Sequence, residues 1–239
     1  MPATPFIAAS TAITAAVLSV AGSAIVPAGP QTATATAEQI AAYYGRHTNV
    51  LQISITFWSV AAASLLVFSG VASALLRRNG ADIGVATVVA GAGGVAAALI
   101  LAAQGAMAVG VREDFSAADE FTRRTVYLLA DISYNIGDLV LPAIGLLVGA
   151  LSLAAIRRTL LPRWLGYLGA PIAVAALLGT IAPIHGEQVG VFEVLEVAAY
   201  LLWPPWIVAT GITLAVWKST RSIPGTESAE LTHLGEPTN

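Results

Sequence analysis

The hydrophobic and polar positions divide this chain into six long apolar runs separated by short polar segments. An apolar run of about 18 to 20 residues forms an α-helix that crosses about 30 Å of hydrocarbon. These runs are continuous, whereas transmembrane β-strands are shorter and alternate in hydropathy. The pattern therefore predicts an all-α, polytopic membrane helix bundle. Its six transmembrane helices are expected near residues 6–27, 51–76, 82–107, 126–156, 165–184 and 192–217.

The fourth run contains the most polar stretch inside an apolar region, Asp131-Ile-Ser-Tyr-Asn-Ile-Gly-Asp138. At about 100° per residue, Asp131, Asn135 and Asp138 share one helix face. The same face continues through the small or helix-breaking residues Pro142, Gly145 and Gly149. The opposite face of the helix is apolar and carries Val140, Ile144, Leu147 and Leu151. In a membrane helix, polar and small faces turn toward other helices. We therefore expect the bundle to pack on the polar face and the apolar face to meet lipid.

The sixth run repeats this arrangement. Glu193, Glu196 and Tyr200 are spaced i, i+3 and i+7, and Pro204 and Gly211 continue the same line. We expect the two polar faces, of the fourth and sixth helices, to bury each other. Prolines inside both runs should kink the helices, because proline has no N–H to donate. Kinked helices whose acidic ends face each other can enclose a cavity.

Composition supports a membrane protein and excludes several other classes. The 239 residues are 56% hydrophobic and 10% charged, with a mean hydropathy of +0.78, whereas soluble domains are about 25% charged. The sequence contains no cluster of Lys and Arg of the kind that indicates a nucleic-acid partner. The chain has no cysteine, which excludes disulfides and thiolate metal sites.

The positive charges predict the orientation of the bundle. Lys and Arg divide seven to four between the two sides of the zigzag, in a chain with 11 of them. The richer side should be cytoplasmic, which places both termini on the cytoplasmic side of the bacterial cytoplasmic membrane. The first run is expected to be a retained helix rather than a cleaved signal, since residues 1–5 carry no positive charge. The polar tail, residues 218–239, should be disordered and cytoplasmic. An amphipathic segment at 38–44 should lie at the outer interface.

Two stretches carry a resemblance to a known family. They are Glu38-Gln-Ile-Ala-Ala-Tyr-Tyr-Gly-Arg-His47 and Thr159-Leu-Leu-Pro-Arg-Trp-Leu-Gly-Tyr-Leu-Gly169. The first resembles a loop found in many actinobacterial multi-pass proteins. The second resembles the Leu-Pro-Arg-x-Leu-Gly signature of a bacterial, actinobacterial-type family of multi-pass membrane proteins of unknown function. The order of the runs also fits that family over about residues 6–217. The resemblance implies a six-helix membrane protein without an established activity, so no catalytic residue is carried over from it.

The Leu-Pro-Arg motif also has a physical interpretation of its own. Pro162 suits the start of a helix, and Arg163 and Trp164 suit anchoring at the inner headgroups. Gly166 and Gly169 permit close approach of a neighbouring helix. We therefore interpret the motif as a topological clamp rather than a ligand site.

Four carboxylates are the candidate catalytic or ion-handling groups: Asp138, Asp131, Glu196 and Glu193. Clustered carboxylates can accept protons, or can hold a divalent cation together with His185 or His47. Glu193-x-x-Glu196 lacks the histidine of the usual Glu-x-x-His helix motif, so the sequence predicts no metal site, with His185 as a weak candidate. The residues expected to line a cavity are Tyr134, Asn135, Tyr200, Trp203, Trp206 and Gln104.

Counting about 20 residues back from Ile156 places the outer edge of the hydrocarbon near Gly137. Asp138 then lies just inside the membrane and the other three carboxylates lie at or above its rim. This depth favours an outward-facing acidic vestibule over a proton path through the membrane.

Three hypotheses about function follow from the sequence. The first is a vestibule between the fourth and sixth helices that handles a small solute, proton or cation, or that serves a membrane accessory role. The second is an intramembrane enzyme that acts on an isoprenoid or lipid substrate, with Asp138 as the acid. The third is a structural subunit that packs through Gly145-x-x-x-Gly149. No cofactor motif is present, and the expected partners are the lipid bilayer and a membrane protein or second copy of the chain.

Overall fold

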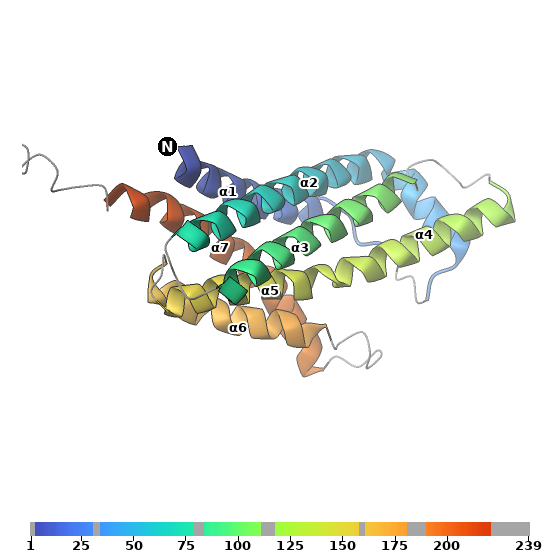
Figure 1. Ribbon diagram of the computed structural model, residues 1–239. Coiled ribbons are helices and arrows are strands. Elements are labelled where there is room, and N and C mark those ends of the chain that lie inside the picture. Colours follow the sequence, from blue (N-terminus) through green and yellow to red (C-terminus); the bar gives the residue numbers. More distant parts are fainter. Residues whose placement is uncertain are drawn as a thin grey trace, which may run out of the picture.

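The computed structural model describes residues 3–30, 34–78, 84–110, 118–157, 161–180 and 190–220. All regular secondary structure in these ranges is helical, as the sequence predicts. The helices are α1 (Ala3–Ala24), α2 (Ala37–Arg78), α3 (Gly84–Gly110), α4 (Glu120–Asp138), α5 (Val140–Ile156), α6 (Arg163–Gly179) and α7 (Val191–Thr220) (Figure 1).

Six of these helices form a closed ring. Around it, α1 packs on α2, α2 on α3, α3 on α5, α5 on α6, α6 on α7, and α7 on α1. Helix α4 prolongs α5 beyond the ring and contacts α3 and α2. Figure 1 shows the starts of α1 and α6 and the ends of α2, α5 and α7 at one end of the bundle. We call this the basic end, because five basic residues of the described ranges belong to it (Arg77, Arg78, Arg157, Arg163 and Lys218) and three belong to the other end (Arg46, Arg123 and Arg124).

Length and composition make this a multi-pass membrane protein. Five helical stretches in the described ranges are long and apolar enough to cross a bilayer, namely α1, α2, α3, α4 with α5, and α7. Helix α6 is apolar but has only 17 residues. The sequence predicts a span at 165–184 there, and residues 181–189 lie outside the described part of the chain.

The predicted helix at 126–156 is divided at Leu139. The backbone N–H of Leu139 bonds to the Ile136 carbonyl at 3.1 Å, and α5 begins at the next residue. Pro142 has no N–H to donate to the carbonyl of Asp138, and its ring crowds that carbonyl. The break therefore falls one turn before the proline.

Helix α5 is buried on both of its faces, so the predicted lipid-facing side is wrong. Val140, Ile144, Leu147 and Leu151, which the sequence places against lipid, are at most 4% exposed. The small-residue face packs on α6, where a Cβ on Gly145 would meet the Ala173 carbonyl at 3.2 Å. The apolar face packs on α3 and the core. The expectation that the apolar side of a membrane helix faces lipid does not hold for α5, because α6 covers one of its sides and α3 covers the other.

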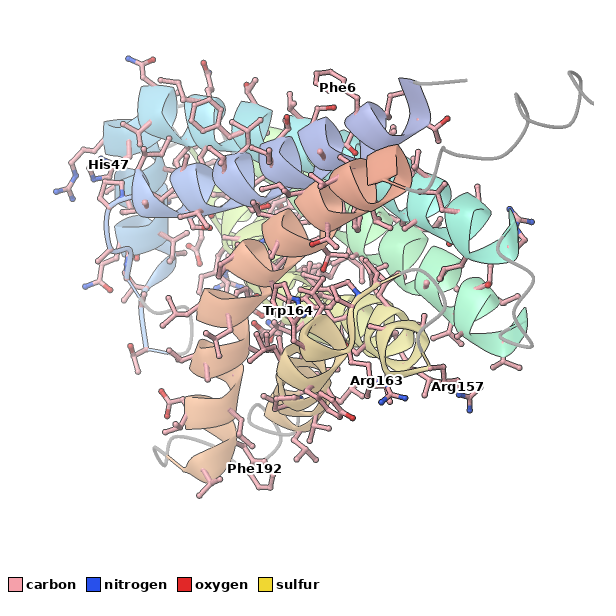
Figure 2. All side chains as sticks on the ribbon, turned by 90° about the vertical axis from the view of Figure 1, so that its left-hand side faces the viewer. Phe6, His47, Arg157, Arg163, Trp164 and Phe192 are labelled. Atoms are coloured by element: carbon pink, nitrogen blue, oxygen red, sulfur yellow. The ribbon has the colours of Figure 1, made fainter. Side chains whose placement is uncertain are left out.

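Glycines of the Leu-Pro-Arg motif bring α6 close to α5 and α7. A Cβ on Gly166 would lie 2.6 Å from the Ser152 carbonyl oxygen of α5, and one on Gly169 would lie 2.6 Å from the Trp206 ring of α7. The Trp206 indole Nε1 donates to the Leu165 carbonyl at 2.9 Å. Arg163 and Trp164 are exposed at the basic end, where Arg163 and Arg157 lie toward the same side of the view (Figure 2).

At the opposite end, the start of α2 and the first half of α4 extend the bundle. Thr36 and Gln39 form a reciprocal cap at the start of α2, with the Thr36 N–H donating to Gln39 Oε1 at 2.9 Å and the Gln39 N–H to Thr36 Oγ1 at 3.3 Å. The predicted amphipathic segment 38–44 is this first part of α2. It bends at His47, whose φ of −113° and ψ of 16° are not helical, and Ile40 packs against α4 (Figure 1).

Candidate functional site

The candidate site is a cavity of about 560 Å³ inside the ring, on the side away from the basic end. Its volume falls in the range of small-molecule pockets, about 300–1,000 Å³. Helices α1, α2, α3, α4, α5 and α7 all contribute to it. The lining residues are Ser19, Val20, Ser23, Ala24, Trp58, Leu101, Gln104, Gly137, Val140, Tyr200, Leu201, Trp203 and Pro204.

The cavity exists because α1 and α7 diverge. Near the end of α7 the two helices touch, and a Cβ on Gly211 would meet the Ala8 carbonyl at 3.0 Å. Toward Phe192 the helices separate (Figure 2), and the cavity lies along the stretch where they do. Val20 and Leu201 line it and are 52% and 70% exposed, so the cavity reaches the surface between α1 and α7.

Three aromatic side chains form much of the wall. Tyr200 and Trp203 come from α7 and Trp58 from α2. Trp58 lies against α1 because Gly22 leaves room for its indole, and a Cβ on Gly22 would lie 2.7 Å from Nε1. The Tyr200 hydroxyl donates to the Gly137 carbonyl at 3.5 Å. This long hydrogen bond joins α7 to the junction of α4 and α5.

Polar groups of the cavity are few and uncharged. The side chain of Gln104 lies against Gly137, where a Cβ would come within 2.7 Å of its Nε2. The Ser19 hydroxyl is buried at the wall and has no hydrogen-bond partner among the described residues. Since a buried hydroxyl without a partner costs roughly 1–3 kcal/mol, a ligand whose polar group displaced the side chains that cover this oxygen would recover that energy.

On the side of the basic end, the cavity is followed by apolar packing. Phe68, Ile144 and Ile207 are each at most 1% exposed, and they belong to one continuous core cluster that also includes Trp203. These side chains separate the cavity from the basic end.

A family model described as a domain of unknown function (DUF4386) matches residues 6–217. The chain belongs to this family. No curated protein and no solved structure matches the chain. Membership in the DUF4386 family agrees with the membrane helices and assigns no activity, so the role of the cavity depends on its own chemistry.

The carboxylates of this DUF4386 domain lie beside the cavity rather than in its wall. Asp138 is half-buried, and its neighbours Gly137 and Val140 line the cavity. Asp138 and Glu193 both interact electrostatically with Glu196, whose backbone packs against Gly179 of α6. Three of the four predicted carboxylates are therefore brought near one another.

The other predicted site residues have different positions. Asp131 is partly exposed on α4, and Asn135 is exposed and donates its Nδ2 to the Asp131 carbonyl at 2.7 Å, away from the cavity. His185 and the side chain of Tyr134 lie outside the described residues. Within the described ranges, no three His, Asp or Glu side chains are placed to hold a metal ion.

Two predictions about the packing of α7 in the DUF4386 domain need correction. The polar faces of the fourth and sixth predicted helices meet only locally, at Tyr200 and Gly137, because α7 packs mainly on α6 and α1. Trp206, predicted to line the cavity, instead bonds to Leu165 and fills the space left by Gly169. The cavity does include Gln104, Tyr200 and Trp203.

Among the lining residues that the sequence did not supply as candidates, Ser19, Ser23 and Trp58 carry polar or aromatic side chains. Sequence alone does not say that the first helix packs against the last. For Ser19 and Ser23 the available signal was their position on either side of Gly22, because such small residues are typical of a helix face that packs in a membrane.

Asp138→Asn is expected to raise the midpoint of thermal unfolding at neutral pH, because it removes one of the negative charges that repel Glu196. A rise of roughly 2–4 °C corresponds to about 1 kcal/mol in a chain of this size. Glu193→Gln, at an exposed position, should change the midpoint less. Intrinsic fluorescence of the purified protein during heating measures both. Equal shifts in the two variants would show that the burial of Asp138 is unimportant.

Proposed function

We propose that this DUF4386 protein binds an uncharged amphipathic small molecule that enters its cavity from the membrane. The observation that supports this proposal is the lining itself, in which three aromatic rings and several aliphatic side chains surround one unpartnered hydroxyl. The hydrocarbon part of the ligand would lie against Trp58, Tyr200 and Trp203. Its polar group would bond to Ser19.

Entry from the bilayer is supported by the position of the opening. Val20 and Leu201 are exposed and apolar, and they flank the gap between α1 and α7. A water-soluble substrate would have to pass these side chains, whereas a molecule dissolved in lipid already contacts them. Such a ligand leaves the hydrocarbon only for a cavity of similar polarity, so Ser19 and the ring faces would supply the selectivity.

This proposal differs from the acidic vestibule and the intramembrane enzyme that the sequence suggested. Every described residue that lines the cavity is uncharged, so the wall offers neither a carboxylate for proton or cation handling nor an acid at the bound molecule. Packing around Phe68 and Ile207 closes the route to the basic end. The structural-subunit hypothesis loses its proposed face, because Gly145 and Gly149 lie against α6 of the same chain.

The orientation is part of the same proposal. The basic end carries Arg77, Arg157 and Arg163, and the positive-inside tendency would place it in the cytoplasm. Both termini would then be cytoplasmic, and the cavity would lie in the outer half of a bacterial cytoplasmic membrane. We also propose that the Leu161-Pro-Arg-Trp-Leu-Gly166 element is a signature of the family, since it joins α6 to both α5 and α7.

Partly filling the cavity is expected to weaken binding. An ω-brominated alkyl alcohol quenches tryptophan fluorescence on contact, so its binding beside Trp58 and Trp203 can be titrated in the purified protein. Ala24→Phe, at a lining position, should weaken binding at least about tenfold, which is about 1.4 kcal/mol. Ala63→Phe makes the same change at an exposed position of α2 outside the lining and should leave binding unchanged.

Ser19→Ala tests the polar part of the proposal. It should weaken binding of the brominated alcohol and leave binding of a brominated alkane of equal length unchanged, because only the alcohol can bond to the hydroxyl. The brominated probes also quench Trp164, which is exposed outside the cavity. This quenching is the same in all variants and is subtracted as background. Identical titrations for wild type, Ala24→Phe and Ala63→Phe would refute the cavity as the binding site.

A further inference from the structure

A second cavity lies outside the ring, between the segment that follows α1 and the first part of α2. Its volume is also about 560 Å³, and its lining is mostly polar. The lining residues are Ala28, Pro30, Thr34, Ala35, Gln39, Tyr43, Arg46 and His47. It shares no residue with the cavity between α1 and α7, and it contains charged and hydrogen-bonding side chains that the proposed function does not use.

Tyr43 gives this second cavity a fixed wall. Its hydroxyl donates to the Pro27 carbonyl at 2.7 Å, and its ring covers Gly29, where a Cβ would come within 3.1 Å of the ring. The ring of His47 lies against it, with centroids 4.9 Å apart. His47 is at the edge of the molecule in Figure 2. The segment 27–30 is thus held against α2 by specific contacts, which shape the cavity before any ligand arrives.

Hydrogen-bond donors predominate among the polar groups. Arg46 uses its Nε on the Ala42 carbonyl at 3.2 Å and makes no ion pair with any described residue, so its terminal NH2 groups remain for a ligand. Gln39 Oε1 already accepts from Thr36 in the cap of α2, which leaves the Nε2 donor of the same amide. A group that complements these donors must carry several acceptor oxygens.

Carboxylates do not neutralise the site. No described lining residue is acidic, and the nearby Glu38 interacts electrostatically with Arg123 of α4. The net charge of the lining is therefore positive. Guanidinium groups bind phosphate oxygens through paired, charge-assisted hydrogen bonds.

We infer that this second cavity, which we call the Arg46 site, binds the phosphate of an anionic membrane lipid. Its place along the chain supports a lipid source, since it directly follows the end of the membrane helix α1 and its wall is a tyrosine, a residue typical of the membrane–water interface. The lipid would brace the segment after α1 against α2. Basic pockets between transmembrane helices bind anionic lipid headgroups on the cytoplasmic side of membranes, and the Arg46 site would use the same charge pairing at the opposite side.

Thermal unfolding of the full-length protein in a neutral detergent tests the inference with three probes: short-chain phosphatidylglycerol, short-chain phosphatidylcholine and inorganic phosphate. Phosphatidylglycerol at about ten times its Kd should raise the midpoint by roughly 3–5 °C. The zwitterionic lipid should raise it less. If inorganic phosphate reproduces the full shift, the Arg46 site takes the oxyanion itself, from lipid or from solution; if it does not, the lipid is the ligand.

Arg46→Gln should abolish the shift and Arg46→Lys should retain part of it, because lysine keeps the charge without the paired donors. Arg124→Gln is the matched control, since Arg124 is an exposed arginine on α4 that pairs with Glu120 at 2.6 Å, and it should keep the full shift. A shift of equal size in Arg46→Gln and wild type, or no shift with any of the anionic probes, overturns the inference. Both results are independent of the cavity between α1 and α7.

Discussion

Gly166→Ala is expected to lower the unfolding midpoint of this protein, although it adds a single methyl group to a helix. The added Cβ would lie 2.6 Å from the carbonyl oxygen of Ser152 and 2.9 Å from the backbone nitrogen of Ile156. Both atoms belong to the backbone at the end of α5, which cannot turn aside as a flexible side chain can. The two helices would have to separate along their whole contact, at a cost of about 1–3 kcal/mol or more.

Gly70→Ala is the control for this substitution, because it makes the same chemical change inside α2. Nothing lies within 4 Å of a Cβ built on Gly70. Alanine favours the helix over glycine by about 0.8–1.0 kcal/mol, so this variant should unfold at the wild-type temperature or slightly higher. Each kcal/mol corresponds to roughly 2–4 °C, which heating in detergent with fluorescence detection resolves. If Gly166→Ala unfolds no earlier than Gly70→Ala, the close approach of α5 and α6 is wrong.

The membrane class and the helices followed from hydropathy, since a helix must satisfy its backbone inside lipid whatever its neighbours are. The all-helical fold is confirmed, and so is membership in a family of unknown function. The close-packing role predicted for Gly166 and Gly169 also agrees with their contacts. In these cases the physical requirement is local, so a single segment of sequence is enough to state it.

The surroundings of α5 depend on several segments of the chain, and the prediction that one side of this helix faces lipid was wrong. Leu147 and Ile144 look like lipid-facing residues in isolation, because Leu and Ile are equally at home in lipid and in a protein core. Their burial results from α3, where Gly93 allows the backbone of Leu147 to approach; a Cβ on Gly93 would lie 2.8 Å from that nitrogen. Hydrophobicity alone does not distinguish the two environments.

The prediction of the residues that line the cavity was limited in the same way, because it also depends on which helices are neighbours. Tyr200, Trp203 and Gln104 were candidates because they are aromatic or polar residues inside apolar runs, and all three line the cavity. Ser19 is polar too, but its importance depends on α7 lying beside α1 and on the lack of a partner for its hydroxyl. The carboxylates were the strongest charges in the apolar runs and hence the first candidates, but none of the four lines the cavity, and only Asp138 and Glu193 lie near Glu196.

Trp203 and Trp206 are expected to separate binding from stability. Trp206 is 4% exposed, fills the space above Gly169 and donates to the Leu165 carbonyl at 2.9 Å. Trp206→Ala should therefore cost about 3–5 kcal/mol of unfolding free energy, the range for removing a large aromatic side chain from a core. Trp206→Phe keeps most of the packing and loses the N–H bond, for about 1 kcal/mol. In either variant the folded protein should still bind the brominated alcohol with wild-type affinity.

Trp203 is equally buried, at 4% exposed, but its indole faces the cavity between α1 and α7. Trp203→Phe should keep the fold with a small decrease in midpoint and weaken the brominated alcohol severalfold, because the shortened ring leaves part of the ligand without contact. Quenching of Trp58 still reports binding in this variant. Titrations at a temperature well below each midpoint compare only folded molecules. If Trp206→Phe weakens binding as much as Trp203→Phe does, the ligand lies between α6 and α7, and the cavity between α1 and α7 is not its site.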